Sequence, residues 1–171
     1  MNYSIAIIGL GLMGGSLALD LSVWRKKSDI TGYDIDRETR EWCLRNGIID
    51  RIAESPQDAV KGADLIFVAT PVRDIPRVYS IISPHLTTNA VLFDLGSTRQ
   101  WIFDHLSPRP ENHLYCGFHP MGGGVNFGAQ YARRQLFNGH PVLVTPYRPL
   151  KNGEMNLIEE IAGCMESRVF F

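Results

Sequence analysis

The amino-acid sequence predicts a doubly wound α/β fold, in which helices cover both faces of a mostly parallel sheet. Apolar runs of strand length alternate along the chain with helix-like stretches, and no repeat or linker interrupts them. These runs are apolar throughout instead of alternating with polar residues, which is typical of strands buried in a parallel sheet. A length of 171 residues is enough for a core, so we expect residues 1–171 to form one domain.

Local composition places the individual elements. Runs rich in β-branched and aromatic residues predict strands, and stretches bounded by capping residues, glycine or proline predict helices. Strands are expected at residues 3–8, 29–33, 63–69, 90–95, 114–118, 142–145 and 168–171. Helices are expected at residues 13–24, 36–45, 74–82, 98–106 and 154–165, with a further helix starting at Ser55.

Two of these helices begin with a capping signal. The side chain of Asp36 can accept bonds from the free N–H groups of the helix that follows, and the dipeptide Asn46-Gly47 is typical of its end. The segment Ser55-Pro56-Gln57-Asp58 has a capping serine, a proline at the first helical position and an acid that closes a variant of the capping box.

Charge and composition exclude several classes of function. The formal net charge is -1, so nothing favours binding to nucleic acid or to an anionic membrane. No run approaches the roughly 18 apolar residues of a membrane span, and the first four residues have no basic n-region, so we expect a cytoplasmic protein. Cys43, Cys116 and Cys164 are far apart, which favours reduced, buried thiols over a metal site or a disulfide.

A glycine-rich loop follows the first predicted strand. It reads Gly9-Leu10-Gly11-Leu12-Met13-Gly14 and opens a helix, and an acidic residue, Asp34, follows 20 positions after Gly14. This is the dinucleotide pattern of a Rossmann domain: the first glycine allows a tight turn, the second lets the pyrophosphate approach, and the third lets the helix pack on the sheet. The helix N-terminus adds free N–H groups and a partial positive charge. A glycine-rich turn without a ligand is the alternative.

Asp34 bears on which dinucleotide binds. A carboxylate at the end of the second strand can accept hydrogen bonds from a ribose 2′-hydroxyl and repels a 2′-phosphate, so it favours NAD over NADP. Arg37 lies close in sequence and would partly offset that repulsion. The alternative role of Asp34 is to cap the next turn.

Three motifs lie in residues 9–18, in Phe93-Asp94-Leu95-Gly96-Ser97-Thr98-Arg99 and in Gly117-Phe118-His119-Pro120-Met121-Gly122-Gly123. Together they resemble the N-terminal signature, the Asp-x-x-Ser-x-Lys segment and the Gly-x-His-Pro-Met-Ala-Gly segment of the prephenate and arogenate dehydrogenases. The resemblance implies an NAD-dependent oxidoreductase of tyrosine biosynthesis. Such an enzyme moves a hydride from the ring hydroxyl carbon of prephenate to the nicotinamide, while carbon dioxide leaves and the ring becomes aromatic. The alternatives are an arogenate or related hydroxy-acid dehydrogenase, and a non-catalytic dinucleotide-binding module.

The same resemblance implies roles for particular residues. His119 would engage the substrate hydroxyl, and an imidazole, which ionises near neutral pH, suits the removal of its proton. Ser97 would bind close by, although a serine there can also cap a helix, and Arg99 would contact substrate. Thr70-Pro71 resembles the turn under the nicotinamide ribose; a strand that simply ends at proline is the alternative.

The sequence also departs from the family pattern. Arg99 replaces a lysine, Gly122 replaces an alanine, and Gly124-Val125-Asn126 replaces a run that contains glutamate. Family members have a second, helical domain that forms the dimer and supplies a cation for the substrate carboxylates, and we expect this domain to be absent from the chain. Arg133 and Arg134 are candidate replacements for that cation but are expected on a solvated helix. The expected partners are therefore the small-molecule substrate and either a second copy or a separate helical-domain protein.

Overall fold

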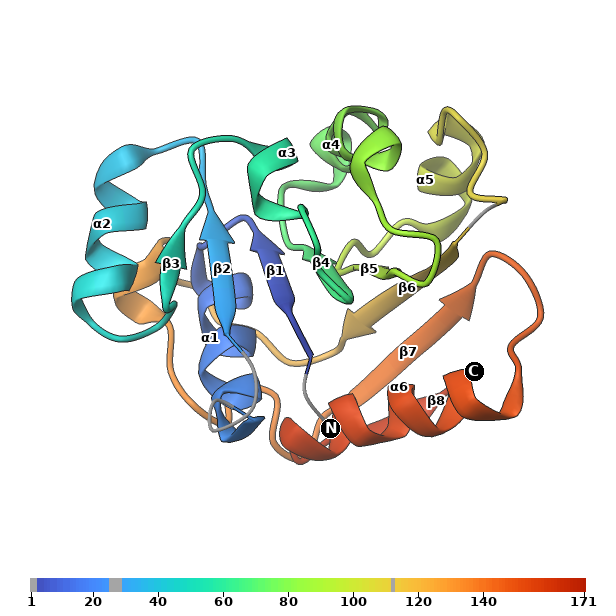
Figure 1. Cartoon of the computed structure of the whole chain (residues 1–171). Coiled ribbons are helices and arrows are strands. Elements are labelled where there is room, and N and C mark those ends of the chain that lie inside the picture. Colours follow the sequence, from blue (N-terminus) through green and yellow to red (C-terminus); the bar gives the residue numbers. More distant parts are fainter. Residues whose placement is uncertain (1–2, 25–28, 112) are drawn as a thin grey trace.

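A computed structural model describes residues 3–24, 29–111 and 113–171. In these residues the strands form one eight-stranded sheet in the order β3-β2-β1-β4-β5-β6-β7-β8 (Figure 1). All neighbouring strands are parallel except β6 and β7, which are antiparallel. The predicted fold class is therefore confirmed. Met1 and Asn2, which open the sequence without a basic n-region, lie outside the described residues.

The elements follow one another in the predicted alternation. The strands are β1 (Ile5–Ile8), β2 (Ile30–Tyr33), β3 (Arg51–Ile52), β4 (Leu65–Val68), β5 (Val91–Asp94), β6 (Leu114–Pro120), β7 (Pro141–Pro146) and β8 (Arg168–Phe170). The α-helices are α1 (Leu12–Leu21), α2 (Arg37–Arg45), α3 (Pro56–Ala59), α4 (Ile75–Ile82), α5 (Arg99–His105) and α6 (Asn152–Cys164). Short 3₁₀ turns are η1 (Ser22–Trp24), η2 (Val72–Asp74), η3 (Ser83–His85) and η4 (Ala129–Tyr131).

Two hydrophobic cores cover the two faces of the sheet, because alternate residues of each strand point to opposite faces. In β1, Ile5 and Ile7 pack with α1 and α6, whereas Ala6 and Ile8 pack with α3, α4 and α5. Figure 1 shows α3, α4 and α5 along one side of the sheet and α1 and α6 along the other. Burial on both faces is the reason that the strands are apolar throughout.

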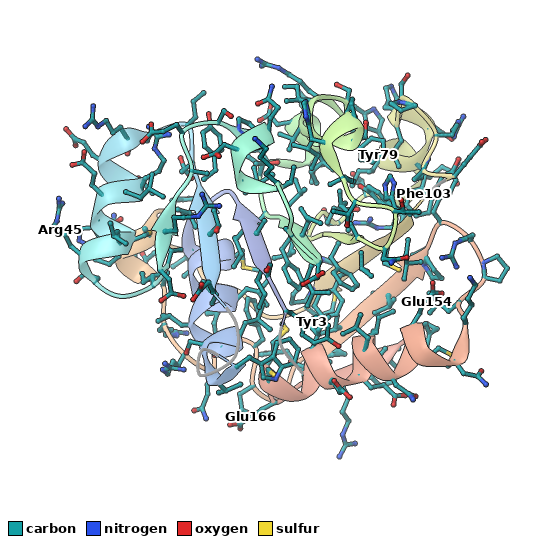
Figure 2. All side chains as sticks on the ribbon, viewed as in Figure 1. Tyr3, Arg45, Tyr79, Phe103, Glu154 and Glu166 are labelled. Atoms are coloured by element: carbon teal, nitrogen blue, oxygen red, sulfur yellow. The ribbon has the colours of Figure 1, made fainter. Side chains whose placement is uncertain are left out.

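An aromatic cluster fills the core between α4 and α5. Tyr115 of β6 meets the ring of Tyr79 edge to face, with the centroids 5.4 Å apart, and the ring of Phe103 at 6.0 Å. Figure 2 labels Tyr79 and Phe103 on this side of the sheet. Edge-to-face pairs of this kind add about 1 kcal/mol beyond the area they bury. The cluster therefore holds α4 and α5 against β6.

The predicted caps are confirmed. Asp36 accepts hydrogen bonds from the N–H groups of Glu38 and Thr39, and Ser55 accepts one from the N–H of Asp58. The carboxylate of Asp58 accepts from the N–H of Glu54, one residue earlier than a standard capping box would place that bond.

The predicted helix around Arg133 and Arg134 is wrong. Residues 134–139 form turns, and residues 132–135 pack against α1, where the guanidinium of Arg134 donates to the carbonyl of Leu19 and to the hydroxyl of Ser22. Small residues on α1 make this contact: a Cβ on Gly15 would lie 2.7 Å from the Cβ of Ala132. Long-range packing against α1 decides the conformation of this segment, so its own sequence does not show it.

Candidate functional site

The carboxyl ends of the central strands meet at one edge of the sheet. Ile8 is level with Tyr33 and Val68, and Val68 is level with Asp94, so the residues that follow these strands lie side by side. Ligands of doubly wound folds bind at this edge. The glycine loop follows β1, Asp34 follows β2, Thr70 follows β4, Ser97 follows β5, and His119 lies at the end of β6.

Two of the three loop glycines are required by packing. Gly9 has a φ of +95°, and a Cβ there would lie 2.7 Å from the carbonyl carbon of Ala69. A Cβ on Gly14 would overlap the carbonyl oxygen of Gly9. Both close contacts involve backbone, which cannot move aside as a flexible side chain can. These two glycines therefore shape the loop.

Gly11 is different, because a Cβ at this position would have no atom within 4 Å. The open space lies beside the first turn of α1, which Gly11 caps without a side-chain hydrogen bond. The first turn holds no acidic residue, so no carboxylate within it neutralises the partial positive charge of the helix end. A group with negative charge, such as a pyrophosphate, fits this space and these free N–H groups.

The carboxylate of Asp34 closes the loop from the side of β2. Its Oδ2 accepts the N–H of Leu10 at 2.8 Å and its Oδ1 accepts the N–H of Asp36 at 3.0 Å. Asp34 therefore caps the next turn, as the alternative interpretation expected. Each carboxylate oxygen can accept more than one hydrogen bond, so capping leaves acceptor capacity for a ribose hydroxyl.

A cavity of about 340 Å³ joins most of the predicted cofactor residues. Its lining includes Gly9, Gly11, Asp34, Thr70 and Pro71. Within the described part of the chain, the hydroxyl oxygen of Thr70 is buried and has no hydrogen-bond partner. An orphaned buried hydroxyl is costly unless a ligand or water completes it, so the cavity fits a polar ligand such as a nucleoside.

The other loop residues do not line this cavity. Leu10 and Leu12 are buried in the core beneath the loop, and Met13 is half-buried. Sequence reasoning missed Asp74 and Arg77, which also line the cavity. Asp74 ends η2 and Arg77 lies in the first turn of α4, and their place directly after the Thr70-Pro71 turn is the signal that could have found them.

His119 lies near the end of β6 and is half-buried. Its Nδ1 is 3.2 Å from the carbonyl oxygen of Leu95, in the loop after β5. Because a carbonyl oxygen only accepts, Nδ1 must carry the proton in this bond, and Nε2 of the neutral ring is then free to accept one. The geometry makes Nε2 a proton acceptor at the ligand-binding edge.

Arg99 forms a bidentate ion pair with Asp94. Its guanidinium donates to the two carboxylate oxygens of Asp94 at 2.6 Å and 2.8 Å, and to the carbonyl oxygen of Gly96. Asp94 is completely buried, and sequence reasoning gave it no role. Its place in the resembling motif, five residues before Arg99, is the signal that could have found it.

Ser97 is exposed in the loop after β5, and it does not cap α5. The capping position is Thr98, and no side chain accepts a bond from the helix start there. The alternative role of Ser97 as a helix cap is therefore wrong, and its contact with substrate stays a prediction.

The loop after β6 passes over the start of α1. A Cβ on Gly124 would lie 3.3 Å from Cδ2 of Leu12, and one on Gly123 would lie 3.7 Å from the sulfur of Met13. This packing places the histidine segment next to the glycine loop. Val125 and Phe127 of the same loop are 91% and 87% exposed, so the loop presents apolar side chains beside the site.

The cysteines take no part in this chemistry. All three are free, and burial raises the pKa of the Cys43 and Cys116 thiols to about 12. A protonated thiol is a poor nucleophile. In residues 3–24, 29–111 and 113–171, no group of His, Cys, Asp and Glu is placed to hold a metal ion. No helix in the same residues has the length and apolar character needed to cross a membrane.

Comparison with known proteins agrees with this arrangement. Residues 17–170 match the family described as "Prephenate dehydrogenase, nucleotide-binding domain". A cyclohexadienyl dehydrogenase of Zymomonas mobilis is 32% identical over 142 residues, which is 83% of this chain and 48% of that protein. A prephenate dehydrogenase of Bacillus subtilis is 32% identical over 148 residues, which is 85% of this chain and 40% of that protein.

Solved structures add a match in three dimensions. The structure of prephenate dehydrogenase from A. aeolicus in complex with hydroxyphenyl propionate and NAD+ has a TM-score of 0.85 and 26% identity to this chain. The match covers 99% of this chain and 59% of that one. The chain spans about half the length of the curated relatives it matches.

Proposed function

The chain belongs to the prephenate dehydrogenase family as its nucleotide-binding domain, and we propose that it takes part in the NAD-dependent oxidative decarboxylation of prephenate to 4-hydroxyphenylpyruvate. The observation that carries the proposal is the orientation of His119. Its Nδ1 faces the carbonyl oxygen of Leu95, which leaves Nε2 as a proton acceptor at the carboxyl end of β6.

The residues of the chain have separable tasks in this reaction. Removal of a hydride from the ring carbon turns the alcohol into a carbonyl-like centre, so a base must take the hydroxyl proton. Nε2 of His119 accepts that proton, while Nδ1 stays bonded to Leu95. Nε2 then returns the proton to the ring oxygen when carbon dioxide leaves and the ring becomes aromatic. Ser97 binds the substrate from the neighbouring loop, as the resemblance predicts. When bound, NAD supplies the hydride acceptor.

NAD is held by the residues that the cavity brings together. The open space at Gly11 and the start of α1 would receive the pyrophosphate, and Thr70 and Pro71, which line the same cavity as Gly11, would contact the ribose near the nicotinamide. Asp34 binds the adenosine ribose, and its negative charge disfavours the 2′-phosphate of NADP. NAD is therefore the preferred cofactor.

Binding of prephenate requires cationic partners for its carboxylates. Prephenate has two carboxylates, which require fixed cationic partners. Among the predicted cations, Arg99 is bound to Asp94 and Arg134 is bound to α1. Arg133 is exposed, with its backbone N–H bonded to Ser16. We therefore propose that a second copy or a separate helical-domain protein completes the substrate site.

The test is turnover with the purified chain, both alone and mixed with a separately produced helical domain of the same family. Prephenate and NAD are added, and the absorbance of the reduced cofactor is followed, with arogenate in a parallel reaction. Replacing a general base costs about 10²- to 10⁴-fold in rate, so His119→Asn should lower kcat by that factor and leave the Kd for NAD nearly unchanged. The matched control is His85→Asn, because His85 is exposed in η3 and lies outside the cofactor cavity.

Each outcome leads to a different conclusion. Turnover of arogenate alone would replace prephenate as the substrate. NAD binding without turnover, even when the helical-domain protein is added, would favour the non-catalytic module. Retained kcat in the His119→Asn protein would remove His119 from the mechanism.

A further inference from the structure

The bond from His119 to Leu95 depends on how the loop after β5 is held. Leu95 lies between Asp94 and Gly96, and the guanidinium of Arg99 bonds to both of these neighbours. The carboxylate of Asp94 also accepts the N–H of Gly96 at 2.9 Å. The residues on both sides of the Leu95 carbonyl are therefore tied to one cation.

The same guanidinium contacts the strand that carries the histidine. A Cβ on Gly117 would overlap the guanidinium of Arg99, so this side chain lies directly on the backbone of β6. Gly117 is two residues before His119, and residues two apart in a strand point to the same face. Arg99 thus touches β6 on the face from which His119 projects.

The surroundings leave Arg99 little freedom. Its guanidinium lies 5.8 Å from the centroid of the Phe103 ring, which Figure 2 labels beside α5. Its side chain is 18% exposed and the Asp94 side chain is fully buried. Gly96 is equally confined, because a Cβ there would lie 2.6 Å from Cδ1 of Ile102 and 2.8 Å from Cδ1 of Ile75.

We propose that Arg99 is a positioning residue: through Asp94 and Gly96 it holds the Leu95 carbonyl against Nδ1 of His119 and so selects the ring tautomer with a free Nε2. The value of this tautomer for proton removal rests on the function proposed above. A planar guanidinium can bond two carboxylate oxygens and a carbonyl at once, whereas the compact ammonium of lysine cannot match that fork. Arginine at this position therefore matters for geometry as well as for charge.

The tautomer is read directly by long-range ¹H–¹⁵N NMR of the ¹⁵N-labelled 171-residue chain, at about pH 8, where an ordinary imidazole is neutral. The His119→Asn protein identifies the His119 signals by their loss. We expect the native chain to show a protonated Nδ1 and a bare Nε2. In Arg99→Lys the ratio of the two tautomers should fall by about fivefold, equivalent to about 1 kcal/mol, which is the usual worth of one hydrogen bond.

Arg148→Lys is the matched control. Arg148 makes a bidentate pair with Glu154, at 3.0 Å and 2.6 Å. Glu154, which Figure 2 labels, lies in the first turn of α6. Arg148→Lys removes the same kind of bidentate ion pair at a place away from His119, so the tautomer ratio of His119 should stay at its native value. If Arg99→Lys does not fold, the double change Asp94→Asn with Arg99→Gln removes the pair without leaving a buried charge unpaired. The same fall in the ratio is expected there.

The result that overturns the positioning role is a native tautomer ratio in folded Arg99→Lys or in the folded double variant. A lower affinity for prephenate at a native tautomer ratio would also overturn it, and would support the substrate contact predicted from the sequence. Because NMR needs neither substrate nor turnover, failure of the proposed reaction would leave this measurement intact.

Discussion

The glycine loop allows one prediction in which two neighbouring glycines behave in opposite ways. Gly11→Ala adds a methyl group that meets no atom within 4 Å, whereas the methyl group of Gly14→Ala overlaps the carbonyl oxygen of Gly9. The first change should therefore act on cofactor binding, and the second on the stability of the fold.

The magnitudes follow from what each methyl group meets. Alanine at a capping position costs less than about 1 kcal/mol relative to glycine, and 1 kcal/mol shifts Tm by about 2–4 °C at this size. Overpacking against backbone costs about 3 kcal/mol, so Gly14→Ala should lower Tm by about 6–12 °C. A charge-assisted hydrogen bond is worth about 1.5–3 kcal/mol, so a pyrophosphate pushed away from one N–H group should bind about tenfold to a hundredfold more weakly in Gly11→Ala.

Thermal unfolding measures the first quantity, and isothermal titration with NAD measures the second. The Gly11→Ala protein should melt within about 4 °C of the native chain and bind NAD at least tenfold more weakly. Native affinity for NAD in that variant would refute the approach of the pyrophosphate to Gly11. A fall in Tm as large as that of Gly14→Ala would refute the assignment of separate roles.

Two further predictions concern carboxylates. NAD should bind at least about tenfold more tightly than NADP. Asp34→Ala should reduce this preference, because the variant lacks the carboxylate that repels the 2′-phosphate of NADP. Equal Kd values for the two cofactors in the native chain would contradict the prediction. Burial raises the pKa of Asp20, whose charged form also meets Glu166, while the N–H of Gln135 and the charge of Arg134 lower it. The pKa is thus higher in the folded than in the unfolded chain, so the stabilisation from Asp20 is complete below the unfolded pKa and is lost as the pH rises through the folded one. The free energy of unfolding of Asp20→Asn, measured with denaturant, should therefore increase relative to that of the native chain as the pH rises from about 4 towards 7. A difference between the two proteins that does not change with pH would count against the buried charge.

Much of the fold was accessible from the sequence because its signals are local. The helix cap at Ser55 needs only the N–H groups of the next turn, and the φ of +95° at Gly9 favours glycine whatever else surrounds it. The apolar runs could be located for the same reason. Strand direction has no such signal: the run at residues 142–145 indicates a strand, but nothing in it shows that β7 pairs antiparallel with β6.

The site was predicted in the same uneven way. The glycine loop and Asp34 were named from spacing and Thr70-Pro71 from the family resemblance, and the structure brings Gly9, Gly11, Asp34, Thr70 and Pro71 to one cavity. The partners of the polar side chains were not predicted. Arg99 was expected at the substrate, and its bond to a buried carboxylate became visible only once β5, α5 and β6 were packed together.

The sequence by itself determined the alternation of strands and helices, the caps and the glycine loop, since each depends on residues within a few positions of one another. Tertiary structure alone decided that Gly11 faces open space, that residues 132–135 lie on α1, and that Nδ1 of His119 faces the carbonyl of Leu95. The last two features join atoms that are 24 to 117 residues apart in the chain, and such contacts exist only after both partners have been placed by the sheet.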